Sequence, residues 1–190
     1  TDMYLAALPA VAEDLNTTST NASLTLSAFM VGMALGQLVV GPLSDKTGRR
    51  KPLLFGVVVC FIATVACGFS PNIELLIFAR FMMGFTGSIG AVLARSIVTD
   101  TTQGLATAKL MGIMMMINGF APVLAPLFGG WVLSWGGWRD IFHVLGVVTA
   151  IMMLGVVFVV KETLPVEERY QGTALSVYSE LPQVFKVRRY

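Results

Sequence analysis

The sequence predicts an all-α membrane protein, built as a six-helix bundle with a 3+3 inverted repeat. Of its 190 residues, 55% are hydrophobic and 13% are charged, whereas soluble domains average about 25% charged residues. Mean hydropathy is +0.76, and the apolar residues gather in runs long enough to cross a bilayer. The cations cluster in loops and form no basic face of a soluble fold, so we expect no nucleic-acid partner.

The apolar runs define the spans and the domain boundaries. Residues 5–11 form the end of a first span, which we expect to be truncated because its beginning would lie before Thr1. The other five spans are expected at residues 21–43, 52–69, 73–98, 105–133 and 141–160. We assign residues 1–165 to this bundle and residues 166–190 to a cytoplasmic linker. An imperfect amphipathic surface helix is predicted at residues 173–190.

Residues 41–51 form a short, strongly basic connection between the second and third spans. Its cations are Lys46, Arg49, Arg50 and Lys51. Cytoplasmic loops of membrane proteins carry an excess of Lys and Arg, and the loops on the other side hold only Arg139. The sequence therefore predicts a multi-pass protein with this connection, read as a tight turn, and the C-terminal tail in the cytoplasm.

A weak internal repeat supports the 3+3 plan. Gly41 and Gly48 bracket the connection after the second span, and Gly130 and Gly137 bracket the one after the fifth with the same spacing, 89 residues later. An Arg follows each pair. Three helices followed by three of opposite orientation is the plan of many secondary transporters.

Two charged residues are expected inside the membrane. Arg80 lies about 10 Å into the fourth span at 1.5 Å per residue, where an unpaired charge costs at least a few kcal/mol. It is either a structural, snorkelling Arg or a cation that lines a polar cavity. Asp2 lies deep in the first span if that helix begins upstream, and its environment could tune it to bind and release a proton; otherwise it is an exposed chain end.

Polar and flexible residues within the spans suggest a transport cavity. The fifth span is rich in Gly and Pro, including Pro122, Pro126, Gly129 and Gly130, so it is either a kinked packing helix or one whose bend separates two transport states. Met115 is either packing filler or part of an adaptable apolar wall. The candidate cavity residues are Tyr4, Gln37, Met115 and Asn118.

The sequence favours neither an enzyme nor a metalloprotein. Its single His, His143, has no convergent nucleophile and base, so no catalytic residues are assigned. No metal-ligand spacing is present. We expect no cofactor beyond a proton gradient.

The connection at residues 41–51 resembles motif A of the major facilitator superfamily, G-x-L-x-D-x-x-G-R-[RK]-[KR]. The matching residues are Gly41, Leu43, Asp45, Gly48, Arg49, Arg50 and Lys51. Residues 76–84 are similar to motif B through Leu76, Arg80 and Gly84, with Met83 where Gln is usual. Residues 125–130 are similar to motif C, G-P-x-x-G-G, the mark of drug/proton antiporters, with Ala125 in place of the first Gly.

The start of the chain points to one branch of that superfamily. Residues 1–9 resemble the T-D-M-Y-L-P-A-L-P opening of bicyclomycin and chloramphenicol resistance (Bcr/CflA-like) transporters, except that Ala6 replaces a Pro. Residues 138–142 and 162–165 fit the same branch. The resemblance implies that the chain is the first half of a twelve-span transporter, partnered by a C-terminal six-helix half.

The resemblance also implies roles and a function. Asp2 and Arg80 would couple a proton to substrate, Asp45 would dock on the C-terminal half, and Arg49 would form a charge latch with Asp100. The expected function is proton-coupled efflux of small lipophilic drugs across a bacterial inner membrane by alternating access. The alternatives are a facilitator or symporter for a metabolite, and a membrane sensor or assembly protein that transports nothing.

Overall fold

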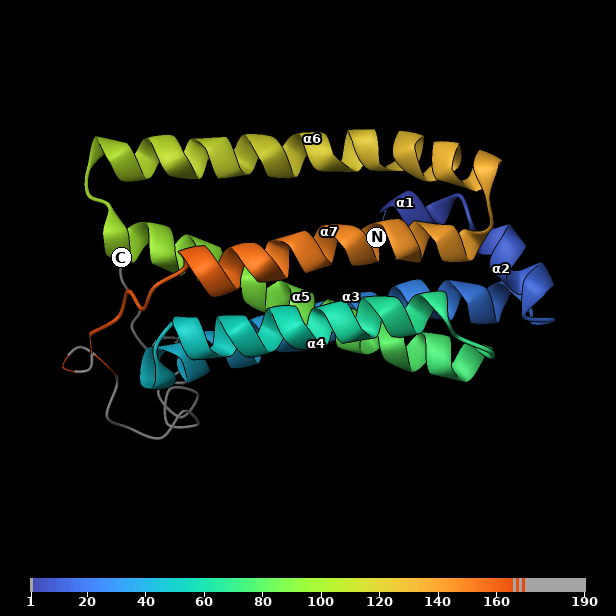
Figure 1. Cartoon of the computed structure of the whole chain (residues 1–190), viewed down its shortest axis with the longest axis horizontal. Coiled ribbons are helices and arrows are strands. Elements are labelled where there is room, and N and C mark those ends of the chain that lie inside the picture. Colours follow the sequence, from blue (N-terminus) through green and yellow to red (C-terminus); the bar gives the residue numbers. More distant parts are fainter. Residues whose placement is uncertain (1, 166, 168, 170–190) are drawn as a thin grey trace, which may run out of the picture.

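Every regular element of the computed structural model is an α-helix within the residues it describes, which are 2–165, 167 and 169. The helices are α1 (Asp2–Leu5), α2 (Leu8–Asp14), α3 (Ser19–Thr47), α4 (Arg50–Gly68), α5 (Ile73–Thr101), α6 (Leu105–Trp135) and α7 (Trp138–Val159). The five from α3 to α7 are long and apolar enough to cross a membrane (Figure 1). The prediction of an all-α membrane fold is confirmed, and the predicted surface helix lies outside the described residues.

The first predicted span is a broken helix. α1 ends at Leu5 and α2 begins at Leu8, with Pro9 in the first turn of α2. Proline has no N–H to donate to the carbonyl of Leu5, and its ring clashes with that carbonyl, but it is tolerated at the start of a helix. The helix is therefore interrupted between Leu5 and Leu8.

The predicted tight turn at residues 41–51 is wrong in its extent. α3 continues through Pro42 to Thr47 and α4 begins at Arg50, so only Gly48 and Arg49 connect them. Gly48 has φ +89°, where a side chain is strained, and a Cβ there would lie 2.4 Å from a carboxylate oxygen of Glu162. This single glycine reverses the chain.

The other long helices follow the predicted spans and extend beyond several of them. Side-chain oxygens of Thr18 and Asn72 accept backbone N–H groups at the starts of α3 and α5, at 3.2 and 2.9 Å. Each of these helices has 29 residues and is about 43 Å long at 1.5 Å per residue. The hydrocarbon core is about 30 Å thick, so their ends project beyond it.

The helices α3 and α5 approach each other closely because glycines face the opposite backbone. A Cβ on Gly32 would lie 2.2 Å from the carbonyl oxygen of Phe81, and one on Gly84 would lie 2.1 Å from that of Phe29. Small residues of this kind let membrane helices pack backbone to backbone. This is the most extensive contact between two helices within the described residues.

The packing of the helices follows the 3+3 plan. α3 packs on α5, α1 packs on α6, and α4 packs on α7. The first three spans are α1 with α2, then α3, then α4, and the last three are α5, α6 and α7. In this order the first span corresponds to α5 and α3 corresponds to α6. The contact of α3 with α5 therefore corresponds to that of α6 with α1. The contact of α4 with α7 corresponds to itself. α6 runs along one edge of the bundle (Figure 1), and Gly129 is its one buried residue.

Candidate functional site

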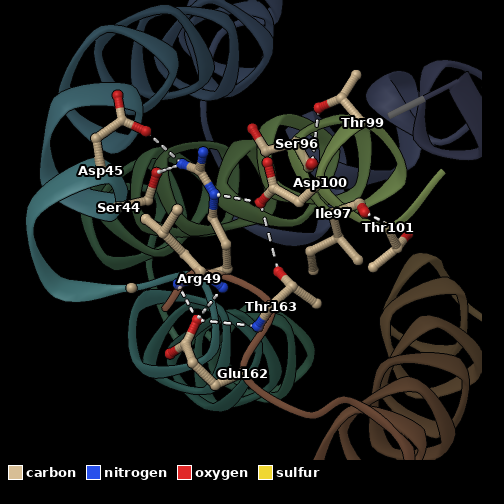
Figure 2. A network of polar contacts seen from close by, with 12 residues as sticks. Ser44, Asp45, Arg49, Ser96, Ile97, Thr99, Asp100, Thr101, Glu162 and Thr163 are labelled. Carbon is tan, nitrogen blue, oxygen red and sulfur yellow. Dashed lines mark hydrogen bonds and ion pairs between the residues drawn. The ribbon is translucent and has the colours of Figure 1, made fainter. Parts of the chain in front are cut away.

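A buried arginine joins three helix ends at the turn between α3 and α4. The Nε of Arg49 donates to Oδ2 of Asp100, at the end of α5, over 3.0 Å. Its Nη1 donates to Oδ1 of Asp45 over 2.5 Å and to Oγ of Ser44 over 2.7 Å (Figure 2). The expected contact of Arg49 with Asp100 is present, and Asp45 takes part in it.

Glu162, which follows α7, completes this network. Its Oε1 accepts the backbone N–H of Arg49 over 2.8 Å, and its Oε2 accepts that of Arg50 over 3.4 Å. Thr163 adds a 3.4 Å hydrogen bond to Asp100 (Figure 2). We call Ser44, Asp45, Arg49, Asp100 and Glu162 the Arg49 clamp; it ties the ends of α3, α5 and α7 to the start of α4.

The electrostatics of the clamp favour its charged form. Burial disfavours the cation of Arg49, but its hydrogen bonds to Asp100 and Asp45 outweigh burial and raise its pKa above the ordinary value. Burial likewise disfavours the carboxylate of Glu162, but the N–H groups of Arg49, Leu164 and Arg50 outweigh it and lower its pKa. Both groups are therefore ionised near neutral pH.

A second buried arginine lies in an aromatic cage. Arg80, on α5, is fully buried, and its Cζ lies 4.5 Å from the ring centroid of Tyr4, 4.9 Å from that of Phe29 and 5.7 Å from that of Phe142. Cation–π attraction stabilises a desolvated guanidinium. Its Nε and Nη2 nevertheless lack a hydrogen-bond partner among the residues described here. Arg80 is thus a buried cation with unused donors.

The structure links Arg80 to the first span through Tyr4. The hydroxyl of Tyr4 accepts a 3.1 Å hydrogen bond from Thr25, which fixes the ring against Arg80. Asp2 is half-buried two residues earlier on α1. In the described part of the chain no ion pair joins Asp2 to Arg80.

The predicted motif C residues meet the same short helix. A Cβ on Gly129 would lie 2.2 Å from the carbonyl oxygen of Met3, whereas one on Gly130 would meet nothing within 4 Å. Pro122 and Pro126 lie inside α6, which stays helical through both. Motif C and the cage of Arg80 therefore contact α1 from different helices.

The predicted cavity residues are not gathered in one place. Tyr4 is fully buried against Arg80, whereas Gln37 on α3 and Asn118 and Met115 on α6 are exposed. The amide of Asn118 donates to the carbonyl of Met114 in its own helix over 2.8 Å. α3 and α6 are not principal packing partners.

A second ionic cluster at the opposite end of the bundle was not predicted. Arg139, at the start of α7, forms an ion pair with Asp14 at the end of α2 and donates to the carbonyl of Ser70 over 3.1 Å. Trp138 also donates to Asp14, over 3.1 Å, and the bonds from Arg139 and Trp138 lower the pKa of Asp14. We call these four residues the Arg139 clamp. Only the repeated Gly-to-Arg spacing hinted at it.

Comparison with models of protein families shows the family of this chain. The model described as Major Facilitator Superfamily matches residues 1–189. The chain belongs to the major facilitator superfamily. This is a superfamily of transporters and not of enzymes. Within the described residues no group of three or more His, Cys, Asp or Glu is placed to hold a metal ion.

Two bacterial relatives match most of the chain. The chain is 41% identical to the uncharacterized MFS-type transporter YdgK of Bacillus subtilis over 185 residues, which are 95% of this chain and 46% of that protein. It is 31% identical to multidrug resistance protein MdtL of Citrobacter koseri over 164 residues, 86% of this chain and 42% of that protein. The chain thus spans less than half the length of these relatives.

A solved structure shows the same fold. The human organic anion transporter MFSD10 (TETRAN) superposes with a TM-score of 0.67 at 21% identity, over 89% of this chain and 40% of that one. This likeness supports the fold of half a transporter.

Proposed function

We propose that the protein carrying this chain is a drug/proton antiporter of the Bcr/CflA-like branch, which expels small lipophilic drugs across a bacterial inner membrane by alternating access. The observation that carries the proposal is Arg80, a fully buried cation with two unused donor nitrogens beside the first span. The relatives named multidrug resistance protein MdtL support the substrate class.

In our proposal the charge balance around Arg80 is the basis of proton coupling. A buried charge without a counter-ion is strongly destabilising. The cation of Arg80 therefore favours the approach of a carboxylate. Asp2 lies on the same short helix as Tyr4, which touches Arg80. In our proposal, deprotonated Asp2 is drawn towards Arg80, and protonation of Asp2 releases it. The break before Leu8 leaves α1 able to shift.

The Arg49 clamp supplies a gate in this proposal. The side chain of Asp45 is half-exposed although it contacts Arg49, so one side of its carboxylate is open to another surface. We propose that it docks on a helix end of the C-terminal six-helix half when the transporter is open outwards. The drug would occupy a cavity between the two halves, with the clamp and the C-terminal tail on the cytoplasmic side.

The test uses everted membrane vesicles that contain the whole protein and an imposed pH gradient. Addition of a transported drug is expected to collapse part of the gradient, and Asp2→Asn and Arg80→Gln are expected to abolish the collapse. Glu13→Gln, which neutralises an exposed carboxylate on α2, is the control and should retain it. Movement of the drug in the same direction as protons would instead establish a symporter.

A further inference from the structure

An apolar groove opens on the outer surface of the bundle between α3 and α4. It has a volume of about 340 Å³, and its lining comes from α3 and α4, with α5 beneath them. The lining includes Val39, Val40, Thr47, Lys51, Phe55 and Ile89. The floor is formed by Val40 and Ile89, which are almost fully buried, whereas the outer wall includes Phe55, which is 62% exposed. The groove therefore opens sideways from membrane-spanning helices.

The polar groups of the groove are confined to one end. Thr47 ends α3 and Lys51 lies in the first turn of α4, so both lie at the end of the groove that leaves the membrane. Lys46 is also exposed, three residues after Leu43 and on the same side of α3. In the described part of the chain no carboxylate pairs with either lysine.

This distribution matches the two parts of a phospholipid. The apolar length from Val39 to Thr47 is about 12 Å at 1.5 Å per residue, enough for the upper part of an acyl chain. Two free lysines at the mouth attract a headgroup with net negative charge. A zwitterionic lipid carries the same chains without the net charge.

We propose that this groove is a binding site for an anionic glycerophospholipid, with an acyl chain between α3 and α4 and the phosphate at Lys46 and Lys51. The site is distinct from the Arg49 clamp, because Lys46 and Lys51 take no part in its hydrogen bonds. It does not depend on the direction of transport or on proton coupling.

The experiment is native mass spectrometry of the purified whole protein, delipidated and titrated with phosphatidylglycerol or with phosphatidylcholine of the same acyl chains. Phosphatidylglycerol is expected to bind at least about 10-fold more tightly. Lys46→Gln with Lys51→Gln should weaken its binding by roughly 25-fold, at about 5-fold for each lysine. Val39→Trp, which fills the groove from its wall, should weaken both lipids.

Matched variants separate the site from general surface charge. Lys109→Gln with Lys161→Gln removes two exposed cations elsewhere, and Val147→Trp adds the same bulk to an exposed position of α7; both should retain tight phosphatidylglycerol binding. Equal binding of the two lipids would overturn the proposal. So would equal losses in the two lysine pairs, or a Val39→Trp variant that binds as the parent does.

Discussion

At the scale of single residues, the two buried arginines have opposite surroundings. The guanidinium of Arg49 is held by two carboxylates and a hydroxyl, which lie near the ends of α3 and α5. Arg80 is held by three aromatic rings and retains unused donors. A satisfied cation fixes structure, whereas an unsatisfied one favours a change that brings a counter-ion.

Arg49→Lys should weaken the clamp although it keeps the charge. A lysine ammonium cannot reproduce the fork that reaches Asp45 on one side and Asp100 on the other. Because the substitution leaves a partly buried charged contact incomplete, we expect it to lower the free energy of unfolding by about 1–3 kcal/mol. The measurement is the Tm in detergent, which should fall. Arg95→Lys, at an exposed position of α5, is the control. An unchanged Tm for Arg49→Lys would mean that the clamp is not a stabilising contact.

Glu162 gives the clamp a pH dependence. Its pKa is lower in the folded protein than in the unfolded chain, so its contribution is present above the ordinary value of 4.5 and is lost as pH falls through the folded pKa. Glu162→Gln should therefore lower Tm at pH 7. The difference from the parent protein should shrink as pH falls below 4.5. A constant difference across this range would show that the carboxylate charge is not what stabilises the contact.

At the scale of helices, the sequence predicted the spans better than their junctions. Long apolar runs locate α3 to α7 to within a few residues at most ends, because only a helix satisfies its backbone in lipid. For the same reason the Gly and Pro at residues 41 and 42 do not end α3, although they would signal a turn in water. The break in the first span had a local signal that we did not use, because Pro9 cannot donate a hydrogen bond to the carbonyl of Leu5, where α1 ends.

The site was predicted in part. The motif A pattern led to Arg49 and Asp100, which the structure joins. Glu162 and the contact of Asp14 with Arg139 link positions more than 110 residues apart, and such contacts depend on how the helices pack. The cavity residues were chosen by polarity within spans, which does not tell which helix faces lie together.

Adjacent glycines of α6 test how α1 is held. Gly129→Ala should push α6 away from Met3, because the new Cβ would lie 2.2 Å from a carbonyl oxygen. Transport and Tm should both fall. A Cβ at Gly130 would lie in open space, and alanine is a better helix former than glycine. The Tm of Gly130→Ala should therefore equal or exceed that of the parent protein. Equal effects of the two substitutions would show that close packing of α6 on α1 is not required.

At the scale of the whole molecule, the two clamps lie at opposite ends of one bundle. The Arg49 clamp joins α3, α4, α5 and the segment after α7. The Arg139 clamp joins α2, α7 and the segment after α4. A bundle tied at both ends is suited to rock as a unit against a second half. The loosely packed α6 and the broken first span are then the parts left to respond to protons and substrate.

The most direct test of proton coupling is the release of protons when drug is added to the purified whole protein in weakly buffered detergent. The account predicts that the parent protein releases protons, that Glu13→Gln does the same, and that Asp2→Asn releases none. Arg80→Gln should also release none, because without the cation Asp2 is no longer drawn into its deprotonated state. Proton release by Asp2→Asn equal to that of the parent protein would contradict the account.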